Sequence, residues 1–400
     1  LLFYPDRNRD DVPDGDPEVL LSGFGLEDTH SVANSLRWGP DGWLYACQGS
    51  TVTANIVVYG RDGKPLNPKP LFSQGQNIWR YHPEKRIYEV FSEGGGNAFG
   101  LELDSEGRIF SGHNGGNTRG FHYQQGAYLQ KGFDKHGPLS HPHAYGYFPA
   151  IPHPDVDRFT HNFVLSDSGA LGEPYQGRLF GVEPLQGRIV MSEITRDGST
   201  FRTRDLGYPV RSTDAFFRPV DIKLGPDGAL YVCDWYDRQV NHYRNHEGQM
   251  DASNGRIYRL RRKDALPGRA VVPGINPAPA TLLGHLTHMN RFLRQEALRL
   301  LTGADDAVVQ KALAALLNAQ PTPGGPDLAL EGLWAAHRVG LLDAALAAQT
   351  LRHPNPQVRL WTARLLGDIR PMNPEFAAAL AEQAARDPDV EARSPYASTA

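Results

Sequence analysis

A hairpin-like stretch that occurs three times constrains this chain more than any other feature. Residues 34–50, NSLRWGPDGWLYACQGS, read as two β-strands joined by a tight turn at GPDG. Proline presets φ for such a turn, and glycine accepts the positive φ that other residues resist. The pattern returns at 220–236, VDIKLGPDGALYVCDWY, and more loosely at 101–112, LELDSEGRIFSG. A hairpin that recurs with aromatic and aliphatic residues on its outgoing strand is typical of β-propeller blades.

The three copies align without gaps, so they share one register. The second copy lies 65 residues and the third 186 residues after the first: Leu36, Gly42 and Tyr45 correspond to Leu101, Gly107 and Phe110, and to Ile222, Gly228 and Tyr231. The predicted blades cover about 34–92, 97–112, 162–206 and 218–260. Between the second and third of them lies a long segment that we expect to be irregular, and long loops on a compact scaffold are usually functional.

These blades predict an all-β propeller over residues 1–262. Residues 1–23 read as the outer half of a blade, so we expect the N-terminal strands to be missing from a partial propeller of the six-bladed TolB-like type. Leu1 is not an initiator methionine, which also indicates a segment of a longer protein.

The composition changes after Arg262. Residues 263–279 form a Pro-rich linker, and the chain beyond it is rich in Ala and Leu at helical spacing. Residues 286–303 and 351–368 align at an offset of 65, and half of that offset is about one helix pair. We therefore predict an all-α HEAT/armadillo-like solenoid over residues 280–400 that continues beyond the C-terminus.

Charge and composition exclude some functions. The net charge is −4 and no long basic run occurs, so a nucleic-acid partner has no electrostatic support. No signal peptide or membrane-spanning run is visible. No C-x-x-C-H motif occurs, so the segment has no covalent haem c site. The two cysteines fall on equivalent points of two hairpins, and we expect two small buried residues in place of a disulfide.

Polar residues gather where predicted strands begin and end. His30 precedes the first hairpin, and Asn97 holds the corresponding place before the second. A histidine can act as a general base near neutral pH, and an arginine can hold a carboxylate in a bidentate manner. A hydrogen-bonded loop residue is the alternative for any single one of them. The other candidates, expected to converge on one end of a central channel, are His113, Arg119, Arg218, Asp221, Asp234 and Arg256.

Two segments suggest metal binding. Asp6, Asn8, Asp10 and Asp14 have spacings reminiscent of a calcium loop, although the glycine and terminal glutamate of an EF-hand are absent. The alternative is an acidic, solvated hairpin loop. The second segment holds His136, His141, His143 and His153, whose spacing fits no helix or strand face.

Several of these motifs together resemble a known family. HSVANSLRWGPDGWLYACQGS, GGNTRGFHY, KHGPLSHPHAYGYF and FRPVDIKLGPDGALYVCDWYD are similar to large membrane-bound dehydrogenases. Members of that family combine a sorbosone/glucose-dehydrogenase-like propeller, HEAT repeats and, in longer members, a C-terminal haem c domain. The resemblance covers nearly the whole chain. It implies relatives that are soluble quinoproteins, which oxidise sugars with pyrroloquinoline quinone and calcium.

The resemblance also implies roles for particular residues. His30 stands where these relatives have their catalytic base. Their R-N-x-x-G-L element is GNAFGL here, which keeps Asn97 and Gly100 but has Gly96 in place of the arginine. Their E-H-G-P loop is GHNG, which keeps His113 and lacks the acid. A quinone carboxylate would then need another cation, for which Arg119, Arg218 and Arg256 are the candidates.

Two functions remain open at this stage. The first is a quinoprotein-like dehydrogenase that oxidises a sugar or alcohol hydroxyl and passes electrons to a haem c of the parent chain or of a separate cytochrome. This reading implies a periplasmic or extracytoplasmic location, with membrane association through the parent protein. The second is a non-catalytic propeller with a HEAT scaffold that binds carbohydrate or a protein partner. The fold does not decide between them.

Overall fold

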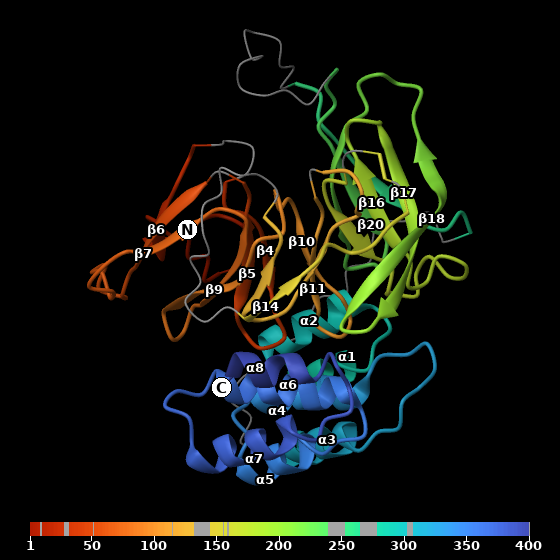
Figure 1. Ribbon diagram of the computed structural model, residues 1–400. Coiled ribbons are helices and arrows are strands. Elements are labelled where there is room, and N and C mark those ends of the chain that lie inside the picture. Colours follow the sequence, from red (N-terminus) through yellow and green to blue (C-terminus); the bar gives the residue numbers. More distant parts are fainter. Residues whose placement is uncertain are drawn as a thin grey trace.

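The strands and the helices of this chain occupy separate parts of the sequence. The computed structural model describes residues 1–8, 10–27, 32–50, 52–113, 115–131, 145–154, 156–157, 160–238, 253–264, 278–301 and 307–399. Within these ranges every strand ends by Leu260 and every helix begins at or after Pro279 (Figure 1). The order of a β region followed by an α region is thus confirmed. The bounds of the two predicted domains, the propeller closure and the solenoid class stay predictions.

The three repeated hairpins form as predicted. They are β4–β5 (Asn34–Trp38 and Leu44–Gln48), β10–β11 (Leu101–Leu103 and Ile109–Ser111) and β19–β20 (Pro219–Leu224 and Leu230–Asp234), all antiparallel. The glycine of each turn has a positive φ, between 71° and 84°. Its amide nitrogen donates to the carbonyl three residues earlier, at 2.9–3.2 Å. The turn chemistry of the sequence therefore sets the hairpin register.

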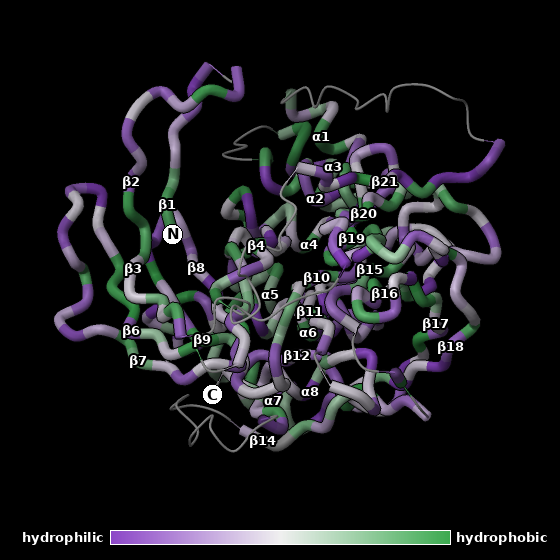
Figure 2. The backbone as a smooth tube through the Cα atoms, turned by 90° about the horizontal axis from the view of Figure 1, so that it is seen from above, coloured by the Kyte–Doolittle hydropathy of each residue, from purple (hydrophilic) through white to green (hydrophobic). Residues whose placement is uncertain are grey.

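Each hairpin belongs to a larger sheet, in which its nearest neighbour strand pairs with it antiparallel. The neighbouring strands are β8 (Asn77–His82), β9 (Ile87–Glu93), β12 (Phe121–Tyr123) and β21 (Arg256–Leu260). A further sheet contains β15 (Phe163–Leu165), β16 (Leu179–Glu183), β17 (Arg188–Asp197) and β18 (Thr200–Arg211). Seen from above, the sheets lie along an arc, and β4, β10, β15 and β19, here called the inner strands, lie on its inner side (Figure 2).

Two parts of the predicted blade plan are wrong. The middle of the predicted first blade belongs to another sheet, in which β6 (Thr53–Val58) pairs with both β7 (Leu71–Gln74) and β3 (Leu21–Phe24). The segment expected to be irregular contains β12, β13 (Ala127–Leu129) and β14 (Tyr145–Phe148), and β13 runs parallel to β9. The N-terminal hairpin β1–β2 (Leu2–Phe3 and Glu18–Val19) is a sheet of its own.

The helices reproduce the offset of 65 found in the sequence. The described helices are α1 (Pro279–His285), α2 (Arg291–Leu300), α3 (Ala307–Leu317), α4 (Leu328–Arg338), α5 (Ala344–Thr350), α6 (Pro356–Gly367), α7 (Pro374–Ala384) and α8 (Arg393–Thr399). The first residues of α1 and α5, and those of α2 and α6, differ by 65 in number. Asn290 and Asn355 are equivalent N-caps, and the side chain of each accepts a hydrogen bond from the amide two residues later, at 3.0 and 2.8 Å.

The repeat extends to a buried arginine in each copy. The guanidinium of Arg294 donates to the carbonyl of His288 and to the carboxylate of Glu331. That of Arg359 donates to the carbonyl of His353 and to the carboxylate of Asp387. Each arginine therefore joins its own helix start to the following helix pair. A repeat of this kind is what the predicted solenoid requires, but it does not by itself fix the HEAT class.

The helices cover one end of the inner strands, here called the turn end because the repeated turns lie there (Figure 1). The Glu106 carbonyl accepts a hydrogen bond from the indole nitrogen of Trp361 at 2.7 Å, and the Pro226 carbonyl accepts one from Asn290 at 2.9 Å. Gly107 has a φ of 71° and lies directly against the rings of Trp361 and Trp334. Since a Cβ there would meet Trp361, glycine serves both the turn and the close approach. Burying one such tryptophan contributes about 4–6 kcal/mol.

Both cysteines are free thiols, as expected, but only Cys47 is fully buried and Cys233 is half-buried. No described helix is long and apolar enough to cross a membrane.

Candidate functional site

The starting ends of the inner strands, here called the loop end, lie opposite the turn end. Contacts between neighbouring strands bring these ends together. Asn34 Oδ1 accepts a hydrogen bond from the amide of Gly100 at 3.3 Å, and Asn162 Nδ2 donates to Asp221 Oδ1. Gly100 lies directly against the side chain of Asn162, where a Cβ would collide. A continuous line of polar residues therefore runs from β4 through β10 and β15 to β19.

The candidate site residues of the predicted blades that the structure describes all lie at the loop end. The reason is that each of them stands close to the strand end that is found there. Asn97 and Arg218 precede β10 and β19, His113 follows β11, and Asp234 ends β20. Asp234 faces Arg256 across the β20–β21 pair. Arg119 precedes β12 and Asp221 lies in the first half of β19. Their immediate surroundings differ, so each group has its own chemistry.

Asn97 and His113 lie on the second inner hairpin. Asn97 is 5% exposed, and its Oδ1 accepts a hydrogen bond from the amide of Ser50 at 2.7 Å. The ring of His113 packs edge-on against Phe121, with centroids 5.2 Å apart, and lies directly against Gly96. Gly96 has a φ of 73°, and a Cβ there would overlap the imidazole. The histidine ring therefore occupies the space that an arginine at position 96 would need.

Arg119 lies inside a buried ion-pair network. Its guanidinium donates to Glu183 Oε1, to both carboxylate oxygens of Asp205 and, at 3.0 Å, to Thr160 Oγ1. Arg119 is 1% exposed. Asp205 is partly buried, but hydrogen bonds from His153 and Arg119 hold the pKa of its carboxyl far below its usual range. Because these partners neutralise its charge, Arg119 stabilises the sheets and is a poor cation for a ligand.

Arg218, Asp234 and Arg256 form a second group, on the last hairpin. Asp234 Oδ1 accepts hydrogen bonds from the amides of Arg218 and Tyr236, at 2.7 and 2.9 Å, which shapes the turn after β20. The Arg218 guanidinium donates to the backbone carbonyls of Phe217 and Arg238. The guanidinium of Arg256 lies 3.3 Å from the centroid of the Tyr236 ring, in a cation–π contact. Within the described ranges neither arginine has a carboxylate ion-pair partner.

Several candidates remain untested or have local roles. His30 lies outside the described residues, as do His136, His141 and His143. In the N-terminal loop the carboxylates bind nearby backbone: Asp6 accepts from the amides of Asp10 and Asp11, and Asp14 from that of Arg7. Asn8 donates to Asp10. In the part of the chain that the structure covers, no group of three or more His, Cys, Asp or Glu side chains could hold a metal ion.

Sequence reasoning missed three polar residues of the loop end. Asn34 and Asn162 form the contacts between strands described above, and His161 stacks on Phe99 with ring centroids 4.6 Å apart. The Nδ1–H of His161 donates to the carbonyl of Val220 at 2.6 Å. The sequence contained a signal for these three residues, since each of them precedes or begins an inner strand in the same way as Asn97 and Arg218 do.

His122 illustrates a titratable group with a structural role. It is 5% exposed, stacks on Phe110 at 5.1 Å and meets the edge of Phe201 at 5.2 Å. Burial lowers the pKa of His122 to about 4, against a small opposing effect of the nearby Glu391 carboxylate. The imidazole is therefore neutral in the folded state at neutral pH.

We expect this histidine to make the fold sensitive to acid. In the unfolded chain His122 becomes protonated below about pH 6.5, whereas in the folded chain it becomes protonated only below about pH 4. The free energy of unfolding therefore falls as the pH falls through this window. The free energy of unfolding should drop by about 2 kcal/mol from pH 7 to pH 5 because of this residue alone. Urea unfolding at both pH values should show a smaller drop for His122→Phe. An identical drop in the variant would contradict the assignment.

Comparison with known proteins identifies the family. The family model described as "Domain of unknown function (DUF7133)" matches residues 1–264, and the chain belongs to this family. No curated protein matches the sequence.

Solved structures with partial likeness include an oxidoreductase described as a glucose dehydrogenase from Thermus thermophilus. It is 15% identical with a TM-score of 0.34, and the match covers 63% of this chain and 88% of that one. The pyrroloquinoline-quinone-bound aldose sugar dehydrogenase from Streptomyces coelicolor is 13% identical with a TM-score of 0.31, covering 58% and 80% of the two chains. At these scores the likeness carries no argument, and function is argued from the residues of this chain.

Proposed function

We propose that this chain is a quinoprotein-like dehydrogenase module with a propeller-type β region, which oxidises a sugar or alcohol hydroxyl at the loop end. One observation carries the proposal. Every described candidate of the blades lies at the loop end, while the helices cover the turn end. Residues that are far apart in sequence thus share one face of the molecule, as a common site requires.

The cationic residues at this face decide whether a quinone carboxylate has a partner. Arg119 is excluded by its ion pairs with Glu183 and Asp205. Arg218 and Arg256 keep an unneutralised charge within the described ranges, because their contacts are backbone carbonyls and an aromatic ring. A buried carboxylate without a cation costs several kcal/mol. These two guanidiniums therefore fit a quinone carboxylate in kind, and we assign them this role.

The remaining roles follow from residue chemistry. His30 takes the hydroxyl proton of the substrate as a general base, and Asn97 and His113 orient the polar groups of the bound molecules. Oxidation of the alcohol to a carbonyl removes two protons and two electrons, and a bound quinone would supply the acceptor for the electrons. They would then leave to a haem c of the parent chain or of a separate cytochrome. This scheme also predicts a periplasmic or extracytoplasmic location and a HEAT-type scaffold for the helices.

The carboxylates of the N-terminal loop, the calcium candidates of the sequence, already have hydrogen-bond partners within that loop. The four residues of the N-terminal loop hold their own backbone or one another.

The test measures quinone binding and turnover by the parent protein. Calorimetry with pyrroloquinoline quinone, with and without calcium, should detect binding, and Arg218→Met should weaken it by roughly 10–100-fold, as for loss of a charge-assisted hydrogen bond. Arg352→Met, an exposed arginine of the helical region (62% of the side chain exposed), is the matched control and should bind normally. Dye reduction with a panel of sugars and alcohols then identifies the substrate.

A second function has an observation in its favour. Phe216 before β19, Trp235 after β20 and Tyr258 of β21 are 37%, 49% and 40% exposed, and aromatic faces of this kind can pack against sugar rings. If the folded parent protein binds no quinone but binds carbohydrate, the chain is a binding module and the dehydrogenase proposal is wrong.

A further inference from the structure

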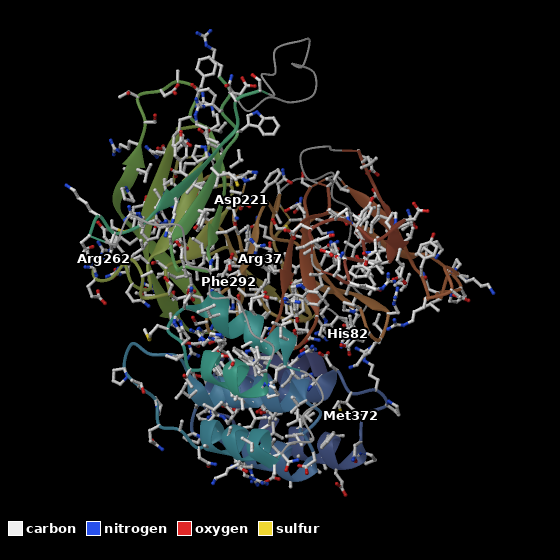
Figure 3. All side chains as sticks on the ribbon, turned by 180° about the vertical axis from the view of Figure 1, so that it is seen from behind. Arg37, His82, Asp221, Arg262, Phe292 and Met372 are labelled. Atoms are coloured by element: carbon white, nitrogen blue, oxygen red, sulfur yellow. The ribbon has the colours of Figure 1, made fainter. Side chains whose placement is uncertain are left out.

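A cavity at the turn end, opposite the proposed site, has the character of a ligand pocket. It has a volume of about 320 Å³ and lies between the inner strands β4, β10 and β19 and helix α2. This volume is at the small end of ligand pockets, which span roughly 300–1,000 Å³. Figure 3 shows Arg37, and Phe292 of α2, in the region where the sheets meet the helices. The β region and the helical region thus both contribute walls.

Three cations from three different elements border this cavity. Arg37 of β4 and Arg291 of α2 share the carboxylate of Glu102, with N–O distances of 3.5 and 3.0 Å. Lys223 of β19 lies 3.0 Å from Asp221 Oδ1. Arg291 also pairs with Asp167 at 3.1 Å and is only 2% exposed. Each of the three cations is thus already paired with a carboxylate, so a ligand can use only the N–H groups that these pairs leave over. Burial fixes Arg291 in place, whereas the side chains of Arg37 and Lys223 are each 26% exposed.

The cavity has buried hydrogen-bond donors that lack acceptors among the described residues. Nη2 of Arg37 and Nη1 of Arg291 are buried and have no hydrogen-bond partner among the described residues. Lys223 Nζ, also buried, has only its ion pair with Asp221 in the described part of the chain and keeps further N–H groups. Both oxygens of Glu102 are already engaged by the two arginines. Since an unsatisfied buried donor costs about 1–3 kcal/mol, the cavity favours a molecule that supplies acceptors.

The rest of the wall combines apolar side chains with Gln295 and Glu296 of α2, and the Glu296 carboxylate is paired with Arg299 at 2.6 Å. Leu36 and Trp38 of β4 are 44% and 42% exposed, and Phe292 of α2 is half-buried beside them. An inorganic ion would use the cations and leave these rings in water. A molecule with a carbon skeleton would use both.

We propose that this cavity binds a small organic anion, of the size and class of a sugar acid. Its carboxylate is held by Arg37, Lys223 and Arg291, and its carbon skeleton packs against Trp38 and Phe292. Because the ligand contacts β4, β19 and α2 at once, its binding strengthens the attachment of the helices to the sheets. The cavity adjoins the loop-end line of polar residues at Asp221, whose Oδ1 contacts both Asn162 and Lys223. The proposal is argued from the cavity residues alone and does not depend on the dehydrogenase proposal.

Calorimetry on the full chain with three probes tests the proposal. Gluconate should bind, glucose should not bind because it lacks the charge, and inorganic phosphate should bind more weakly than gluconate because it lacks the skeleton. Gluconate should also raise the unfolding temperature. Lys223→Met should weaken gluconate binding by roughly 10–100-fold. Lys64→Met is the matched control, since that lysine is 81% exposed on the β6–β7 loop, and its affinity should equal that of the wild type.

A second variant separates the two halves of the site. Trp38→Ala removes a partly exposed ring and should weaken gluconate binding while leaving phosphate binding unchanged. The proposal is overturned if gluconate does not bind, if glucose binds as well as gluconate, or if phosphate binds as tightly. It is also overturned if both variants fold and bind gluconate like the wild type.

Discussion

His30→Ala should lower the turnover of the quinone-loaded parent protein by roughly 10²–10⁴-fold, the usual contribution of a general base. The physical reason is that a substrate hydroxyl must lose its proton as the carbon is oxidised, and water at neutral pH accepts that proton poorly. A general base acts only while it is unprotonated, so the activity of the wild type should rise with pH as this base loses its proton, and the variant should lose this rise. Steady-state dye reduction across pH 5–8 measures both effects.

The matched control for this prediction is His285→Ala. His285 is the last residue of α1, in the region that covers the turn end, so its loss should leave turnover and pH profile unchanged. Calorimetry must show that His30→Ala still binds the quinone. If that variant binds quinone and retains the turnover and pH profile of the wild type, His30 is not the base.

Asp368→Ala should destabilise the whole chain by about 3–5 kcal/mol, because a buried guanidinium and an indole lose their hydrogen bonds to a buried carboxylate. Asp368 follows α6 and receives three hydrogen bonds from the β region. Arg80 donates to its two oxygens at 2.6 and 3.2 Å, and the indole of Trp43 donates at 2.9 Å. Arg80 is fully buried and lies 4.0 Å from the centroid of the Trp43 ring. Glu89, which lies 2.7 Å from Arg80, would remain as an ion-pair partner in the variant, but the indole of Trp43 and two of the Arg80 N–H groups would lose their acceptor.

Urea unfolding followed by tryptophan fluorescence measures this loss. Asp62→Ala is the control, because Asp62 is 61% exposed and its ion pair is with the exposed Lys64 at 3.7 Å, so its removal should change stability by less than about 1 kcal/mol. Equal unfolding midpoints for the two variants would show that Asp368 does not anchor the helices.

Local signals in the sequence were enough for the repeated elements. The GPDG turns and the offset of 65 predicted hairpins and helix pairs to within a few residues, because turn geometry and N-caps depend on adjacent residues. Pairing between distant strands was harder to predict. The β6–β7 hairpin pairs with β3 in place of its neighbours β5 and β8, and only tertiary packing selects between such partners. The strands β12 and β13 have three residues each, too few for a period-2 pattern to stand out.

The sequence indicated where the candidate residues lie along their strands, but it did not indicate which side chains they contact. The order of the strands predicts that Asn97, His113 and Arg218 lie at one end of the sheets, next to the strands that they precede or follow. The sequence could not show that Arg119 is neutralised by Glu183 and Asp205, which lie 64 and 86 residues away. Nor could it show that His113 fills the space beside Gly96, since that contact depends on how two loops meet.

The contacts at the turn end have a consequence for the descent of this chain. Asn290 of the α2 cap holds the turn at Pro226, Arg338 of α4 lies against Gly42, Trp361 of α6 holds Glu106, and Ser394 of α8 meets Tyr145. Every helix pair therefore contacts the β region, and the contacts of α4 and α8 both fall on the six-stranded sheet that contains β4 and β14. Loss or duplication of a single helix pair would displace the contacts that the later helices make with the sheets. The two regions are thus bound to change together, and recombination that exchanges one of them alone should rarely yield a folded protein.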